Sequence, residues 1–113
     1  MVIVGRDDII TNPKRKSLET IIKTPKKMII IDHNPLGVDE AVNNNASLIM
    51  CGHTHSGQFF PANIFTKLAY GKEGFYGYHK INNTNIVVSS GVGYFQMPMR
   101  TCSHSEIVVL ACY

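Results

Sequence analysis

The stretch Leu48–Gln58, with the sequence LIMCGHTHSGQ, organises the rest of the chain. It begins with an apolar run that predicts a buried strand, and glycines stand on both sides of its two histidines, His53 and His55. In a strict strand, side chains two residues apart share a face, so both imidazoles can aim at one point. Glycines allow the backbone to turn tightly and to approach a bound group. The pattern is typical of a metal-binding turn just past the end of a strand.

Composition limits the class of protein. A chain of 113 residues with 44% hydrophobic and 17% charged residues predicts one globular domain with a modest core. The net charge of +3 comes mostly from basic residues at positions 14–27, which we interpret as a solvated face. Nucleic-acid binding is not expected, because no aromatic residues are interleaved with these charges. We also expect no transmembrane segment and no signal peptide.

Three cysteines without a Cys-x-x-Cys spacing do not indicate a disulfide framework. We interpret them as small buried residues in a reducing compartment, and therefore expect this chain to be cytoplasmic.

The first half of the chain alternates strand and helix patterns. The continuous apolar run Met28–Ile31 predicts a strand covered on both faces, as in a parallel sheet. A helix is expected from an N-cap at Ser17 to a stop at Thr24–Pro25. Further elements are expected as strands over Val2–Val4 and Leu48–Met50 and a short helix over Val38–Val42. The predicted order over residues 2–51 is therefore βαβαβ.

The second half predicts antiparallel strands. Residues 59–71 have an irregular pattern, with a short helical turn expected near Ile64–Leu68. Strand-like runs follow over Phe75–Ile81, Ile86–Ser90 and Glu106–Cys112, and the asparagines at 82, 83 and 85 indicate a turn between the first two. The fold class is therefore α/β, with a βαβαβ unit followed by antiparallel strands.

Histidines follow the ends of two neighbouring predicted strands. His33 comes directly after the second strand, and His53 and His55 come after the third. Ligands of open α/β sheets bind outside the carboxyl ends of the strands, where these side chains fall. Neutral imidazole is a common ligand of transition metals. One such histidine alone is more often structural, but the three together predict a metal site. His79 and His104 lack partners and are interpreted as structural or exposed.

Several blocks carry a resemblance to a known family. Their order and spacing are similar to those of the C-terminal half of calcineurin-like metallophosphoesterases, and most similar to a bacterial group whose members often carry an N-terminal membrane anchor. That group usually has glycine where this chain has Ser56. The blocks are Gly5–Asp8, Asp32–Pro35, Gly52–Gln58, Ser90–Gly93 with Pro98–Arg100, and Ser105–Ile107.

The resemblance implies a fold, a reaction and cofactors. The fold would be the C-terminal half of a four-layer α/β sandwich. The reaction would be hydrolysis of a phosphate ester by a hydroxide that two divalent metal ions activate. Manganese, iron, zinc and nickel all suit histidine and carboxylate ligands. His33 and His53 would bind the second metal ion, and His55 the first.

The resemblance assigns weaker roles to two further residues. Gln58 would line the substrate side and Arg100 would contact a phosphate oxygen, although a buried or capping role suits each equally well. Asp7 and Asp8 are interpreted as structural.

Other family motifs are absent from these 113 residues. They are the Asp-x-His, Gly-Asp and Gly-Asn-His blocks, which supply the bridging aspartate, most first-metal ligands and the general acid. We therefore interpret residues 1–113 as a partial domain that is inefficient or inactive alone. An unpaired sheet edge and apolar face would then bind the missing N-terminal half or a second copy. The parent protein would be membrane-associated through a missing N-terminal anchor.

Two other interpretations stay open. The chain could be a non-catalytic metal-binding or interaction half-domain that pairs with another chain. It could also be a globular α/β domain whose histidines are structural. The sequence selects neither the substrate nor the metal.

Overall fold

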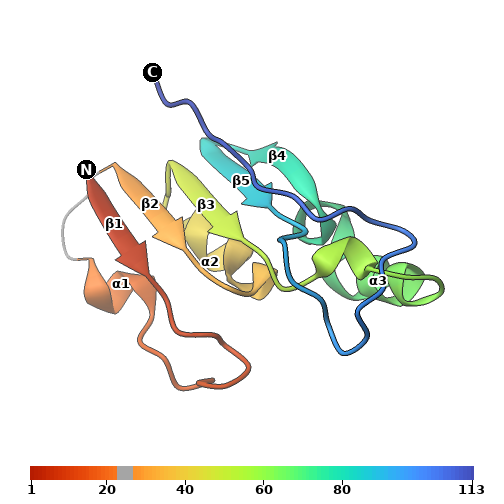
Figure 1. Ribbon diagram of the computed structural model, residues 1–113. Coiled ribbons are helices and arrows are strands. Elements are labelled where there is room, and N and C mark those ends of the chain that lie inside the picture. The colour runs from red at the N-terminus through yellow and green to blue at the C-terminus, as the bar shows by residue number, and fades with distance from the viewer. Residues whose placement is uncertain (23–26) are drawn as a thin grey trace.

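The fold is a single mixed sheet with helices packed on it (Figure 1). The computed structural model describes residues 1–22 and 27–113. Its elements are β1 (Val2–Gly5), α1 (Leu18–Ile21), β2 (Met28–Ile31), η1 (Pro35–Gly37), α2 (Val38–Asn43), β3 (Leu48–Cys51), η2 (His55–Gly57), α3 (Ala62–Phe75), β4 (Gly77–Ile81) and β5 (Thr84–Val88). The strand order is β1-β2-β3-β5-β4, which confirms the α/β fold class.

The predicted βαβαβ unit is confirmed. β1, β2 and β3 are parallel neighbours, and β5 joins β3 in parallel, while β4 runs antiparallel to β5. Because β1, β2 and β3 point the same way, the residues that follow them meet at one edge of the sheet. The predicted turn between the last two strands is present, with Asn82 at a φ of 53°.

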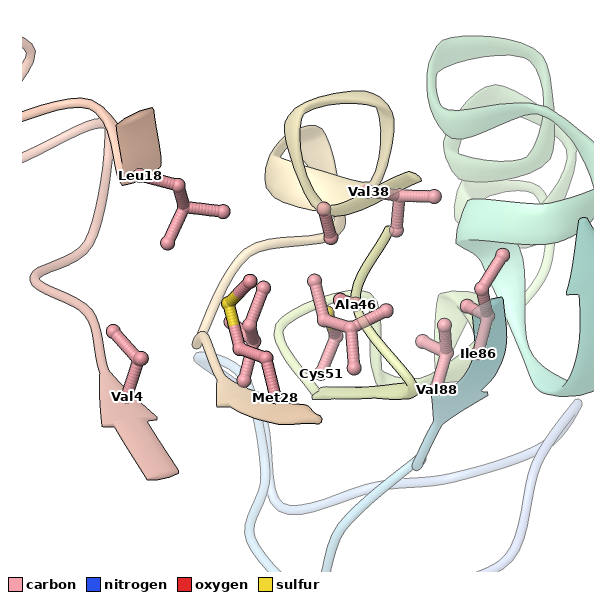
Figure 2. Packing of buried hydrophobic residues seen from close by; sticks show 11 residues of the cluster. Val4, Leu18, Met28, Val38, Ala46, Cys51, Ile86 and Val88 are labelled. Atoms are coloured by element: carbon pink, nitrogen blue, oxygen red, sulfur yellow. The ribbon is translucent and has the colours of Figure 1, made fainter. Parts of the chain in front are cut away.

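One face of the sheet carries the core. Val4, Ile30, Ile49 and Ile86 point from neighbouring strands toward the helices, and each is at most 7% exposed. Leu18 of α1 and Val38 of α2 cover them (Figure 2), and Ala41 of α2 is buried in the same cluster. Each fully buried aliphatic side chain contributes about 1.5–3 kcal/mol, so this layer holds the strand ends in register.

The opposite face is open near β1 and β2, which corrects one expectation. Met28–Ile31 was expected to be covered on both faces, but Ile31 is 49% exposed and Ile3 is 62% exposed. In the described part of the chain all three helices lie on one side of the sheet (Figure 1). The apolar run therefore alternates between buried and accessible side chains, although its sequence does not alternate.

The expected helical turn near Ile64–Leu68 is present, but the expectation that the rest of residues 59–71 is irregular is wrong. The helix α3 spans Ala62–Phe75 and contains a break at Gly71, where φ is 68°. Its apolar residues do not mark a buried stripe, because Phe65 and Leu68 point to solvent. The period that identifies an amphipathic helix is therefore missing from the sequence. Phe75 ends this helix instead of starting a strand.

The predicted strand Glu106–Cys112 is also wrong. This segment has no strand assignment, and Ile107 and Val109 are exposed. A side chain fixes its start: the Glu106 carboxylate accepts hydrogen bonds from the Tyr76 hydroxyl at 2.7 Å and the Ser90 N–H at 2.8 Å.

Two smaller expectations concern the first helix and the membrane. Ser17 precedes α1 as predicted, but its hydroxyl pairs with Thr20 and not with the helix backbone. The predicted stop at Thr24–Pro25 lies outside the described residues. Among the described residues, none of the helices combines the length and the apolar character needed to cross a membrane.

Candidate metal centre

Three polar side chains gather where β1, β2 and β3 end. Asp8 comes from the loop after β1, His33 from the loop after β2, and His53 from the turn after β3. Parallel neighbouring strands bring their carboxyl ends to one edge, and this places the three residues together although they are 25 and 20 positions apart in sequence.

The donor atoms of this group are close enough to share one ion. His53 Nδ1 lies 3.2 Å from His33 Nε2, and His33 Nε2 lies 3.9 Å from an Asp8 carboxylate oxygen. Two nitrogens bound at about 2.0–2.1 Å to one tetrahedral ion lie about 3.3 Å apart. All three donor atoms fall within 4.8 Å of one another. Two imidazoles and one carboxylate therefore fit a divalent transition metal, with the remaining positions left to other ligands.

Electrostatics favour the neutral imidazoles that a metal requires. Burial lowers the pKa of His53 below its ordinary value, and the neighbouring His33 lowers this pKa further. Burial also lowers the pKa of His55, together with the nearby Arg100 guanidinium. At neutral pH both rings therefore offer a nitrogen lone pair.

The turn after β3 has an unusual backbone. His53, His55, Ser56 and Gln58 all have φ between 46° and 64°, a region that residues other than glycine rarely adopt. Gly57 sits among them with a φ of 70°. Such conformations persist only where surrounding structure holds them, and they concentrate at functional sites.

The turn separates the two histidines instead of aiming both at one point. His53 faces His33, with ring centroids 5.1 Å apart in an edge-to-face arrangement. The ring of His55 lies 6.4 Å from that of Phe95, and its Nδ1 accepts a hydrogen bond from Arg100 at 3.3 Å. The residues that the family resemblance assigned to one ion, His33 and His53, are therefore together, and His55 stands apart.

Gln58 and Arg100 are occupied by the protein itself. The Gln58 amide, only 2% exposed, donates to the carbonyls of Phe95 and Met97 and accepts from the Phe95 N–H at 2.7 Å. The Arg100 guanidinium donates to the Ser90 carbonyl at 2.9 Å and to neighbouring carbonyls of the same loop. Both side chains hold the loop over residues 90–97 against the histidine turn, which favours the buried or capping role for each.

Asp8 is the member of this group that the sequence interpretation left structural. Its neighbour Asp7 does bind within its own loop, where it accepts from Asn12 at 3.1 Å. Asp8 accepts from the Ile10 N–H with one carboxylate oxygen and turns the other toward His33. Its place after the end of β1 is the signal that could have identified it, because that position is equivalent to those of the histidines.

A buried ion pair supports the turn that carries His33. Asp32 lies 2.8 Å from the Arg15 guanidinium, and both side chains are nearly inaccessible. The same carboxylate accepts a hydrogen bond from the Asn34 N–H at 3.2 Å. Asp32 and Asn34, the residues before and after His33, are therefore hydrogen-bonded to each other. The loop after β1 is thereby fastened to the loop after β2.

Comparison with known proteins identifies relatives. An "Uncharacterized metallophosphoesterase" of Helicobacter pylori is 37% identical over 75% of this chain and 23% of its own length. A "Transmembrane protein with metallophosphoesterase domain" of Danio rerio is 36% identical over 74% of the chain and 20% of its own length. An uncharacterized metallophosphoesterase of Campylobacter jejuni is 31% identical over 96% of the chain and 29% of its own length.

These matches cover only part of each relative: the chain spans between a fifth and a third of their lengths. They include bacterial and animal proteins, so they do not single out the bacterial group. No family model and no solved structure matches the chain. Its motifs, its sheet and its named relatives agree: the chain belongs to the metallophosphoesterases, as a portion consistent with the C-terminal part of the calcineurin-like domain.

Proposed function

We propose that this chain forms one wall of the active site of a metal-dependent phosphoesterase, which hydrolyses phosphate esters. The observation that carries the proposal is the group of Asp8, His33 and His53, whose donor atoms converge at the carboxyl ends of three parallel strands. A divalent ion held there would supply a Lewis acid for a phosphoryl oxygen and a hydroxide at neutral pH.

The roles of the residues follow from their positions. His33 and His53 would each present a ring nitrogen to the ion, and the Asp8 carboxylate would provide an oxygen beside His33. His55 is directed elsewhere by Arg100, which suits a ligand of a second ion in a dinuclear centre. The ion pair between Arg15 and Asp32 would hold in place the loop that carries His33.

The small number of metal ligands in this chain suggests that other residues must supply the rest. Two imidazoles and one carboxylate around one ion, with a single further histidine nearby, fall short of what two tightly bound ions require. We therefore propose that residues 1–113 are part of a larger domain whose other portion supplies the remaining ligands and the general acid. The accessible face around Ile3 and Ile31 is where that portion, or a second copy, would pack.

A non-catalytic metal-binding half-domain is the second candidate. The hydrogen bonds that occupy Gln58 and Arg100 favour it, because neither side chain is then free to hold a phosphate group.

Phosphate release from an aryl phosphate with manganese, zinc or iron separates the two functions. The protein is tested as residues 1–113 and as the longer product of its gene, each with a His53→Ala variant. The phosphoesterase proposal predicts metal-dependent turnover in the longer protein that His53→Ala lowers at least about a hundredfold, consistent with loss of a metal ligand. His79→Ala is the matched control, since His79 lies on β4 away from the centre. Metal binding without turnover in either form would support the half-domain instead.

A further inference from the structure

A cavity of about 180 Å³ lies directly beside the candidate metal centre. Its walls come from the histidine turn, from α3 and from the loop that contains Phe95. His53 is part of both the cavity wall and the metal-binding group. A molecule with its phosphate at the metal centre would therefore extend its organic part into this cavity.

Aromatic side chains form much of the wall. The ring of Tyr70 lies 5.7 Å from that of His53 in an edge-to-face arrangement. Phe95 stands on the other side against His55, and Phe59 and Ala62 complete the apolar lining. Such rings favour contact with a flat or aliphatic group.

Both threonine hydroxyls and the glutamine amide of the lining are already paired within the protein. The Thr54 hydroxyl donates to the Phe75 carbonyl at 2.7 Å, and the Thr66 hydroxyl donates to the Ala62 carbonyl at 2.9 Å. The Gln58 amide is held by the loop over residues 95–97. Among the described residues, no lysine, arginine, aspartate or glutamate lines the cavity. Apart from the Tyr70 hydroxyl and the two histidine rings, the described lining offers no free polar side chain to a sugar or nucleoside hydroxyl, which disfavours a ligand with several hydroxyls.

We infer that this cavity binds an apolar group of about one aromatic ring, carried by the phosphate ester that the centre holds. The volume supports this size, since a dry apolar cavity of about 150 Å³ is known to accept benzene. The substrate class is thus an aryl or arylalkyl phosphate rather than a sugar phosphate. The assignment rests on the proposed function, because the metal centre places the phosphate.

The test compares two phosphonates that share a head group and resist hydrolysis. Binding of benzylphosphonate and methylphosphonate to the zinc-loaded chain is measured by calorimetry. We expect benzylphosphonate to bind at least about tenfold more tightly, because only its ring occupies the cavity. Ala62→Leu fills the cavity and should abolish this difference, while binding of zinc and of methylphosphonate stays unchanged. Leu68→Ala, at a 77% exposed position of the same helix, should keep the difference.

The other outcomes distinguish a failure of the cavity assignment from a failure of the metal centre. Equal affinity of the two phosphonates, with zinc bound, would overturn the cavity assignment and leave the proposed function intact. Ala62→Leu that retains the full preference would also overturn it. Benzyl alcohol is titrated separately into metal-free protein. If benzyl alcohol binds but neither zinc nor methylphosphonate does, the cavity is present without a metal centre. That result would overturn both the proposed metal centre and the substrate assignment.

Discussion

Gly57 is the residue on which the histidine turn depends most closely. Its φ is 70°, and a Cβ added there would overlap the backbone of Asn63 at the start of α3. Only glycine therefore allows the turn and α3 to approach as they do. This contact fixes His53 and His55 relative to the sheet.

Gly57→Ala should destabilise the protein by about 1–3 kcal/mol, through the overlap with Asn63 and the strained backbone. Chemical denaturation measures the free energy of unfolding. Gly93→Ala is the matched control, because Gly93 has open space around its Cα, and it should change stability by less than about 0.5 kcal/mol. Equal stability of both variants would contradict the packing described for Gly57.

At this scale the sequence predicts the pairing of His33 and His53 but not their orientation. The pairing follows from strand ends, since parallel neighbouring strands must bring their following residues to one edge. The separation of His55 depends on left-handed backbone angles, which residues other than glycine rarely adopt and which no local pattern indicates. The hydrogen bonds that occupy Gln58 and Arg100 join loops over 30 residues apart, so they too become visible only in three dimensions.

At the scale of elements, two ion pairs join the ends of β1 and β2 to the loop and helix beside them. Arg15 reaches Asp32 at the end of β2, and Arg6 at the end of β1 reaches Glu40 of α2 at 3.0 Å. Glu40 also accepts the Leu18 N–H at 2.7 Å, so one carboxylate joins β1, α1 and α2.

Removal of the Arg15 side chain should be strongly destabilising. Arg15→Ala leaves the Asp32 carboxylate buried without its partner, which costs about 3–5 kcal/mol. Because Asp32 also orients the His33 loop, metal affinity should fall in the same variant even where it remains folded. Lys14→Ala, at the neighbouring exposed position, serves as the control. Thermal unfolding and zinc titration check both effects, and normal values in Arg15→Ala would contradict this role.

The Glu40 junction predicts a pH dependence. Burial opposes ionisation of Glu40, but the Leu18 N–H and the Arg6 guanidinium outweigh it and hold its pKa below the ordinary 4.5. A carboxyl whose pKa is lower in the folded state stabilises the fold above its unfolded pKa. That contribution is lost as the pH falls through the folded value.

Glu40→Ala should therefore lower stability by about 1–3 kcal/mol at pH 7, and its difference from the unchanged protein should shrink below pH 4.5. Asp39→Ala, at an exposed position of the same helix, should show a much smaller effect. Urea denaturation at several pH values measures both. A difference that grows on acidification would contradict the sign of this pKa shift.

The elements were predictable where apolar patterns mark them. Three strands and α2 follow continuous or periodic apolar runs that pack in the core. The helix α3 was missed because its large apolar residues face solvent, and the segment after Glu106 was misassigned because its apolar residues do not pair with a strand. In both segments the exposed apolar side chains do not pack in the core of this chain.

At the scale of the whole molecule, the main apolar surface without a packing partner in the described chain is the accessible face of the sheet. Ile3 of β1 and Ile31 of β2 are both exposed on neighbouring strands, where Ile3 is opposite Ile29 and Ile31 is opposite Gly5. In the described chain β1 has a neighbour on one side only. An apolar face next to an unpaired edge favours association with another sheet. Relatives several times longer than this chain contain additional residues that could supply such a partner.

The chain alone should therefore self-associate. Light scattering across a concentration series should show species larger than 12.6 kDa, and the double variant Ile3→Lys with Ile31→Lys should shift them toward the monomer. Leu68→Lys, which adds a charge at an exposed site outside the sheet, should leave the distribution unchanged. A wild-type chain that is monomeric throughout and has a high melting temperature would contradict this prediction.

Zinc titration, followed through the histidine side-chain NMR signals, shows directly whether Asp8, His33 and His53 form a metal centre. We expect His33 and His53 to respond first, ahead of His79 and His104. The variants Asp8→Asn, His33→Ala and His53→Ala should each weaken zinc binding at least about tenfold. His79→Ala should bind zinc as the unchanged chain does. A uniform response of all five histidines, or unaltered zinc affinity in His33→Ala and His53→Ala, would contradict the metal centre.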